Sequence, residues 1–185
     1  MSGVAIEEGG VRLRRAERAD VDFLVALLTH EEVAPFLAAV SARDPAEILA
    51  EVERSLAEPE DFGRFVLEVE EAREWFPAGQ LGFALRNRRS RIASLERLAV
   101  HPDYRGRGLA TRADLLFQRY LLHDLGFHRL ELEVYGFNEQ GIRHADRIGF
   151  VREGVRRKAY LRDGEWVDGV LFGLVREDLG CDDAC

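Results

Sequence analysis

Hydrophobic residues recur along this chain at two spacings, one typical of strands and the other typical of helices. In the first half of the chain the spacing predicts a strand, two helices and then a pair of strands. These segments are residues 11–14, 21–28, 45–56, 64–69 and 80–86. Asp20 and Asp44 stand where the two helices need an N-cap, and Pro45 suits the first position of the second helix.

The connection between the paired strands, residues 70–79, holds Trp75, Phe76 and Pro77. A hairpin connection of this length could place the aromatic residues over a site as a lid, or present them to a second copy in a homodimer. Large aromatic side chains are more often buried than exposed, so we expect these to pack on the protein's own core.

The second half of the chain predicts a strand–helix–strand–helix unit followed by a hairpin. These segments are residues 92–100, 108–125, 130–134, 139–148, 158–162 and 165–175. Gly126 and Gly149 fit the ends of the two helices, and Asp163-Gly164 is a strong hairpin signal. If no bulge interrupts the first strand, alternate residues face one way: Ile92, Ser94, Glu96, Leu98 and Val100. The order predicts an α/β protein of mixed α+β type.

The chain has 185 residues, 46% of them hydrophobic, and fits one domain spanning 1–185. We expect a core of about 11–179 and a short acidic tail, 180–185. No run of about 18 apolar residues predicts a membrane span, and the N-terminal segment lacks the pattern of a leader peptide, so we expect a cytoplasmic protein with no membrane partner. Cys181 and Cys185 lie too near the C-terminal end to stabilise the fold through a disulfide or to act as a buried nucleophile.

The formal net charge of -8 argues against a nucleic-acid partner, which would need a basic surface. The charge is unevenly spread, because residues 97–158 hold 12 basic and 8 acidic side chains while the remainder holds 14 and 26. A polyanionic ligand on the basic part and a cationic acceptor near the acidic part would suit this asymmetry. Scattered solvated charges explain the counts equally well.

The segment most informative about chemistry is a strand that breaks at Pro102 and leads through a glycine-rich loop into the long helix. Free amides and the positive end of a helix dipole converge on such a loop, and Gly106 and Gly108 would let a phosphate approach the main chain. Arg105 and Arg107 add positive charge. The loop lacks the P-loop lysine and the third glycine of a dinucleotide-binding motif, and a glycine pair alone could also be a tight turn.

This loop resembles the pyrophosphate motif of the GNAT superfamily of N-acetyltransferases, Gln/Arg-x-x-Gly-x-Gly/Ala, with Arg105, Gly108 and Ala110 in the defined places. Asn138 after the next strand and Gly149-Phe150 at the end of the next helix extend the resemblance. The resemblance implies the GNAT fold, a single mixed, mostly antiparallel sheet of about six to seven strands flanked by helices. A central pair of strands is expected to splay apart.

The resemblance also implies acetyl-CoA as the cosubstrate and no metal. Backbone of the strand end would pair with the pantetheine arm, loop amides would hold the pyrophosphate, and an asparagine that also caps a helix would contact the arm. The residues in these roles are Leu98, Ala99, Val100, Arg105, Gly106, Arg107, Gly108, Leu109, Ala110, Thr111 and Asn138. A strand amide near Leu98 or Ala99 would polarise the thioester oxygen.

Catalysis needs a group that takes a proton from the acceptor, because an alkylamine is protonated near neutral pH and attacks only when neutral. Glu96 and Glu133 fall where relatives place catalytic glutamates, and Glu133 is slightly favoured. The alternative for each is an ion pair with an arginine such as Arg97 or Arg129.

The sequence departs from the family at the tyrosine that many members place four residues before Gly-Phe, because this position is Ala145. Tyr135 and His144 have suitable chemistry for a general acid, although a buried structural tyrosine and a surface histidine are the simpler interpretations.

Residues 154–168 resemble the Rim-type ribosomal-protein N-terminal acetyltransferases and their relatives. That resemblance implies an amine acceptor, which could be a peptide N-terminus, a polyamine or an amino sugar. With no cysteine near the expected site, we expect direct attack in a ternary complex rather than an acyl-enzyme. The alternative is a catalytically silent sensor domain that binds coenzyme A.

Overall fold

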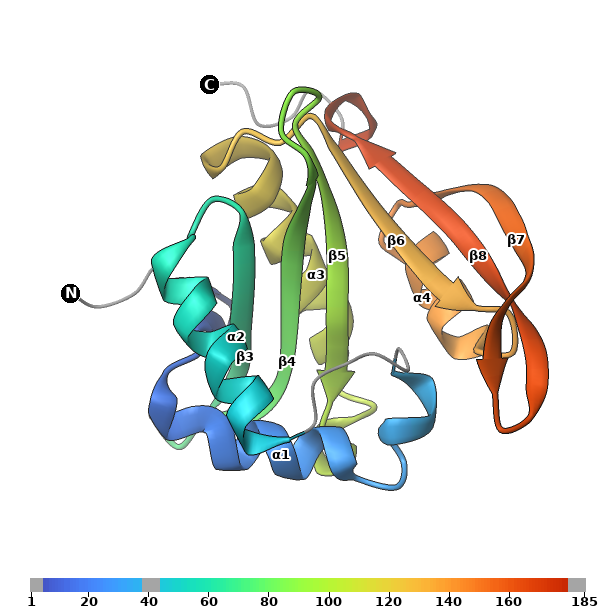
Figure 1. The fold of residues 1–185 in the computed structure, drawn as a ribbon. Helices are drawn as coiled ribbons and strands as arrows, with labels where there is room; N and C mark the ends of the chain where they lie inside the picture. Colours follow the sequence, from blue (N-terminus) through green and yellow to red (C-terminus); the bar gives the residue numbers. More distant parts are fainter. Residues whose placement is uncertain (1–4, 38–43, 180–185) are drawn as a thin grey trace.

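The structure, a computed structural model, describes residues 5–37 and 44–179. Its centre is one eight-stranded sheet in the order β1-β2-β3-β4-β5-β6-β8-β7, in which every neighbouring pair is antiparallel except β5 and β6 (Figure 1). The strands are β1 (Ala5–Glu8), β2 (Val11–Arg15), β3 (Phe62–Glu71), β4 (Glu74–Asn87), β5 (Ile92–Val100), β6 (Arg129–Tyr135), β7 (Val151–Arg162) and β8 (Glu165–Val175). The predicted mixed sheet is confirmed, and β1 adds a strand that the sequence pattern did not reveal.

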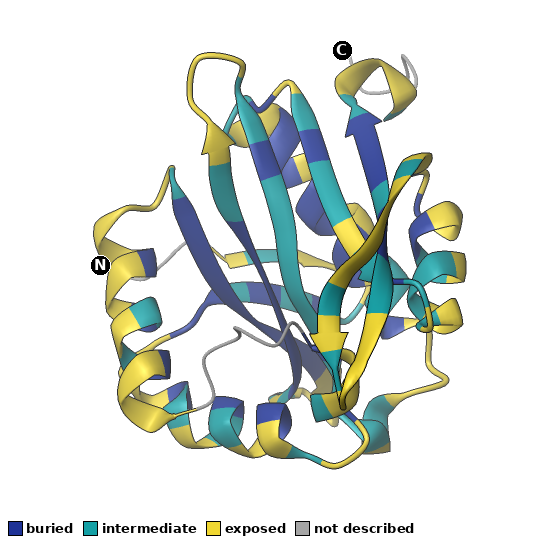
Figure 2. Ribbon diagram, turned by 45° about the vertical axis from the view of Figure 1, so that its right-hand side comes forward, coloured by how far each residue is buried: buried dark blue, intermediate teal, exposed yellow. Residues whose placement is uncertain are grey.

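Helices cover both faces of the sheet (Figure 1). They are α1 (Val21–Thr29), α2 (Pro45–Ala57), α3 (Leu109–Arg119) and α4 (Glu139–Arg147), and α3 continues into a π-helical turn, Tyr120–Asp124. Side chains of β3 alternate between the two layers, since Phe65 and Leu67 join the core beneath α3 and α4 while Val66 joins the core beneath α1 and α2. Figure 2 shows the buried middle of the sheet and the exposed turn end of the β7–β8 hairpin.

The two predicted helix caps differ in what their side chains do. Asp44 accepts a hydrogen bond from Ala46 N at 2.8 Å, as an N-cap should. Asp20 precedes α1 as predicted, but its carboxylate turns away from that helix. It accepts from Glu17 N at 2.7 Å and pairs with Arg14 at 2.7 Å, so it caps the preceding 3-10 turn.

The predicted long connection between β3 and β4 is wrong. The two strands are joined by a turn at Ala72 and Arg73, with φ of 51° and 69°, conformations that usually attract glycine or asparagine. Trp75, Phe76 and Pro77 lie within β4, and none of them joins a buried core cluster, so the expected packing on the core is wrong. Arg12 covers the Trp75 ring at 4.3 Å, and Phe76 is 37% exposed.

Candidate active site

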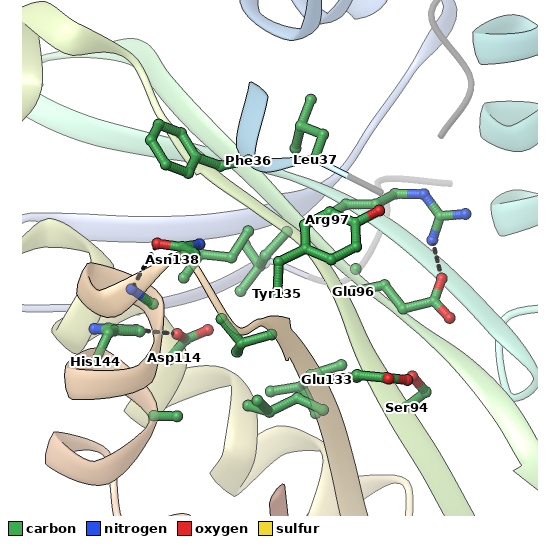
Figure 3. A pocket seen from close by; sticks show the side chains of 18 of the residues that line it. Phe36, Leu37, Ser94, Glu96, Arg97, Asp114, Glu133, Tyr135, Asn138 and His144 are labelled. Carbon is green, nitrogen blue, oxygen red and sulfur yellow. Dashed lines mark hydrogen bonds and ion pairs between the residues drawn. The ribbon is translucent and has the colours of Figure 1, made fainter. Parts of the chain in front are cut away.

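A cavity opens where β5 and β6 separate. The strands pair in parallel at only three positions, Ile92 with Arg129, Ala93 with Leu130 and Ser94 with Glu131. Beyond them the strands splay apart, as the family resemblance implied, and leave a cavity of about 450 Å³ that α3 and α4 also line (Figure 3).

A β-bulge shapes the β5 wall of this cavity. Gln80 of β4 pairs with Ala99 while Gly82 pairs with Glu96, so β5 carries one extra residue opposite β4. Arg97 adopts a φ of 64° at this point. The expected alternation therefore breaks here, and the consecutive residues from Leu95 to Leu98 all line the cavity.

The main chain near Leu98 is accessible to a ligand. No strand pairs with β5 on its β6 side after Ser94, within residues 5–37 and 44–179. Leu98 lines the cavity, whereas Ala99 is buried in the core beneath α1 and α2, and Val100 pairs with Gly79. The three predicted strand residues therefore share one exposed edge while their side chains lie in different surroundings.

The glycine-rich loop has the conformation that close approach of an anion requires. Gly106 and Gly108 have φ of 76° and 70°, and a Cβ built on either would meet no atom within 4 Å. Gly108 is the N-cap of α3, and Arg112 N is the first amide to donate into the helix, to Gly108 O at 3.2 Å. The amides of Leu109, Ala110 and Thr111 consequently have no helical acceptor. The loop residues therefore fit a pyrophosphate group.

The loop arginines are positioned by acidic residues from other elements. Arg105 donates to the Glu32 carboxylate at 2.8 Å, and Arg107 donates to Glu71 at 2.6 Å and lies over the Tyr104 ring. All four charged side chains are at least 42% exposed, so these ion pairs contribute little stability. Either guanidinium could turn to a phosphate at low cost.

Asn138 caps α4 beside the cavity. Its side-chain oxygen accepts from Gly141 N at 2.9 Å, and the residue lines the cavity wall. The capping role that sequence allowed is therefore present, and the remaining surface of the side chain is open to a ligand.

Glu133 lies on β6 with its carboxylate directed into the space between β6, β7 and β8. Its side chain is 25% exposed, and Oε2 lies 3.4 Å from a guanidinium nitrogen of Arg156. Burial, together with a hydrogen bond to Glu133, raises the pKa of Tyr160. Glu133 thus faces the cavity with one arginine and one phenol as partners, and it does not pair with Arg129.

Glu96 is engaged differently, within a chain of alternating charges. Its carboxylate is paired with Arg97, whose other terminal nitrogen donates to Glu51 at 3.0 Å. Glu51 in turn pairs with Arg64, which is buried. Glu96 therefore lines the cavity with its charge already compensated by the bulge arginine.

Tyr135 and Ala145 lie on the wall formed by β6 and α4. The Tyr135 ring is buried, stacks on Phe137 at 5.4 Å and meets the Tyr160 ring edge-on at 5.3 Å. Ala145 is 1% exposed and also lines the cavity.

A second acidic group lies in the cavity wall where α3 meets α4. Asp114 of α3 is buried, and its Oδ2 lies 2.6 Å from Nε2 of His144 on α4 (Figure 3). Burial raises the pKa of Asp114, and the hydrogen bond to His144 opposes that shift. Both residues line the cavity, and His144 is a largely buried partner rather than a surface histidine, since its side chain is 16% exposed.

Comparison with known proteins settles the family. The profile described as "Acetyltransferase (GNAT) domain" matches residues 11–151. The chain belongs to the GNAT acetyltransferase family. A curated relative, the SPbeta prophage-derived uncharacterized N-acetyltransferase YokL of Bacillus subtilis strain 168, is 37% identical over 82 residues, which are 44% of this chain and 46% of the relative. The match spans less than half of that relative.

Solved structures confirm the GNAT fold. A ribosomal-protein-S5-alanine acetyltransferase from Vibrio fischeri has a TM-score of 0.80 at 17% identity, with 96% of this chain and 99% of that chain covered. A spermidine N-acetyltransferase from Vibrio cholerae, in complex with CoA and spermine, has a TM-score of 0.80 at 20% identity, covering 94% of this chain and all of that one. At these identities the likeness establishes the fold alone.

The predicted site residues of this GNAT chain thus fall into three groups. The glutamates, Tyr135, Leu98 and Asn138 meet at the cavity, Ala99 and Val100 end β5, and residues 105–111 form the loop and the start of α3. Sequence reasoning missed Asp114, although an acid beside Ala113 on the buried stripe of α3 is a detectable signal. The tail cysteines, Cys181 and Cys185, lie outside the described residues.

Two other findings concern metals and membranes. Over residues 5–37 and 44–179, no three His, Cys, Asp or Glu side chains are grouped so that they could hold a metal ion. None of the helices in those two ranges is both long and apolar enough to cross a membrane.

Proposed function

We propose that this GNAT protein transfers the acetyl group of acetyl-CoA to a primary amine by direct attack in a ternary complex. The observation that carries the proposal is that β5 leads from the cavity wall at Leu98 to the glycine loop that begins α3, which would give the cosubstrate a path along the strand end. One end of this path offers free amides for a pyrophosphate, and the other offers a carboxylate for an amine. Acetyl-CoA supplies the activated acyl group.

The chain's own groups would hold the cosubstrate along that path. Amides of Leu109, Ala110 and Thr111 would bind the pyrophosphate, with Arg105 and Arg107 turning from their exposed acidic partners. The free edge of β5 near Leu98 would pair with the pantetheine arm, and its amides would polarise the thioester oxygen.

Glu133 is our candidate for the base. Its carboxylate lies in the cavity wall and is only partly compensated by Arg156 at 3.4 Å. It would take the proton from the acceptor ammonium and leave a neutral amine for attack on the thioester carbon. Glu96 is the weaker candidate, because the Arg97 guanidinium that pairs with it also bonds Glu51.

The cavity favours an acceptor with a single amine. Spermidine N-acetyltransferase and ribosomal-protein acetyltransferase are both names found among the structural neighbours. A polyamine is best held by several uncompensated carboxylates, yet Arg86 and Arg97 line this cavity beside Glu96 and Glu133. The third carboxylate in the wall, Asp114, is engaged by His144. Apolar side chains such as Phe36 and Leu37 complete the lining. These features support a peptide N-terminus with a small or apolar first residue as the acceptor class.

The test is release of free coenzyme A from acetyl-CoA in the presence of peptides with varied N-termini, polyamines and amino sugars, with products identified by mass spectrometry. We expect acetylated peptide and a rate for peptides at least tenfold above that for spermidine. A preference for polyamines or amino sugars would overturn the acceptor class alone. Binding of acetyl-CoA by calorimetry, with no coenzyme A released from any amine, would identify a sensor instead of a transferase.

A further inference from the structure

Asp114 and His144 form a hydrogen-bonded pair of the kind that transfers protons in enzymes. The proposed acetyl transfer, as described above, gives this pair no role. Two titratable side chains from different helices meet at 2.6 Å, and both line the cavity proposed to hold the thioester. Asp114 is 5% exposed and His144 16% exposed, so the pair is shielded yet reachable from the cavity. A buried carboxylate that orients an imidazole fixes its tautomer, leaving the other ring nitrogen for a reacting group.

We infer that His144, oriented by Asp114, donates the proton that the leaving thiolate of coenzyme A takes up. The inference rests on the proposed acetyl transfer, which expels a thiolate when the carbon–sulfur bond breaks. Thiols have pKa values near 8.5, so the sulfur of free coenzyme A carries a proton at neutral pH, and an acid beside the breaking bond can supply it. Ala145, the neighbour of His144, has no group that could do this.

The proton balance closes with the groups present. Glu133 takes one proton from the acceptor ammonium, the amine forms the new carbon–nitrogen bond, and the imidazolium of His144 gives its proton to sulfur as the carbon–sulfur bond breaks. The proton that the nitrogen loses in becoming an amide returns to His144 through water in the cavity. Glu133 then releases its proton to solvent, and both residues regain their starting states.

The location also separates the two proton-transfer tasks. Asp114 faces His144 from α3, whereas the other charged groups that line the cavity come from β4, β5 and β6: Arg86, Glu96, Arg97 and Glu133. Two phenols complete the titratable lining, Tyr135 of β6 and Tyr160 of β7. The base lies on the β6–β8 side and the proposed acid on the α3–α4 side, so attack and departure occur on different walls.

Asp114 is a positioning residue in this scheme, and His144 is the catalytic one. A purely structural alternative holds that the pair only ties α3 to α4. The two can be distinguished because a structural tie affects stability, whereas an acid affects the dependence on leaving group and pH.

The test compares His144→Gln and Asp114→Asn with His123→Gln, an exposed histidine after α3 as matched control. We expect His144→Gln to lower single-turnover acetyl transfer by about 10² with acetyl-CoA and by less than tenfold with acetyl-selenocoenzyme A, whose selenolate needs no proton. His123→Gln should behave as wild type.

A readout without turnover uses bound coenzyme A alone. Ultraviolet absorbance of its thiolate, followed against pH, should show deprotonation about one pH unit higher in His144→Gln than in wild type, because an imidazolium stabilises the thiolate. Equal losses with the sulfur and selenium donors, together with an unchanged thiol titration, would overturn the assignment. Absence of transfer by the wild type with every amine would instead refute the proposed function. If His144→Gln fails to fold, the comparison of sulfur and selenium donors and the thiol titration are both made on Asp114→Asn.

Discussion

The carboxylate of Glu133 lies directly over Gly169 on the neighbouring strand β8. A Cβ built at Gly169 would stand 2.0 Å from Glu133 Oε1 and 2.8 Å from the Tyr160 ring. Any side chain at this position would therefore occupy the space that the carboxylate now fills. Glycine at 169 is what allows the Glu133 carboxylate to lie between β8 and the Tyr160 ring.

Gly169→Ala should displace the side chain of Glu133 although residue 133 itself is unchanged. We expect kcat to fall by about tenfold or more while the dissociation constant of acetyl-CoA stays within about twofold, since the glycine belongs to β8 and not to the proposed pyrophosphate loop. Gly154→Ala on β7 is the matched control, because a Cβ there meets nothing within 4 Å. Equal activity of both variants would show that the position of Glu133 is unimportant.

Glu133→Gln tests the base directly. The amide keeps the size of the carboxylate but cannot take a proton, so kcat should fall by about 10² or more with acetyl-CoA affinity nearly intact. Glu96→Gln should cost less, because that carboxylate is held by Arg97. The reverse ranking would assign the role to Glu96, and wild-type kcat for both across pH 6 to 9, with chemistry rate-limiting, would exclude each of them.

Gly108→Glu should abolish acetyl-CoA binding measured by calorimetry. The new carboxylate would enter the pyrophosphate position at the start of α3 and repel it. Gly108→Ala controls for backbone strain at a φ of 70°, and its Cβ would meet no atom within 4 Å. We expect the alanine variant to bind within about tenfold of wild type. Unchanged binding by a folded glutamate variant would remove the loop assignment.

Asp114→Asn should become progressively more stable than wild type as pH rises. Burial raises the pKa of Asp114 above its unfolded value near 3.9, so its contribution to stability is full below that value and is lost as pH rises through the folded pKa. Asparagine does not titrate and can still accept from His144. Urea unfolding should show a larger advantage for the variant at neutral pH than at about pH 3.5, below the unfolded pKa. An advantage that shrinks with pH would contradict the direction of this shift.

The double substitution Cys181→Ala and Cys185→Ala should leave kcat within twofold of wild type. Transfer in a ternary complex needs no thiol nucleophile, and the sequence has no cysteine within residues 5–37 and 44–179, the part of the chain that the structure describes. Initial-rate kinetics should show intersecting lines for the two substrates. An isolable acetylated enzyme with ping-pong kinetics would contradict direct transfer.

The sequence alone determined the features that depend on local chemistry. The glycine loop before α3, the helix ends at Gly126 and Gly149, and the Asp163-Gly164 turn all follow from backbone preferences within a few residues. Hydrophobic periodicity likewise gave most elements, because each must bury one face. It failed at the turn of Ala72 and Arg73, where ordinary residues adopt positive φ.

The tertiary structure decided everything that depends on distance between elements. The bulge at Arg97 shifts the alternation of β5, and it depends on pairing with β4 rather than on the residues of β5 alone. Asp114 and His144 are 30 positions apart, and only the packing of α3 against α4 brings them to 2.6 Å. Sequence patterns record which face of each element is buried, whereas the partners across that face are set by how all the elements pack together.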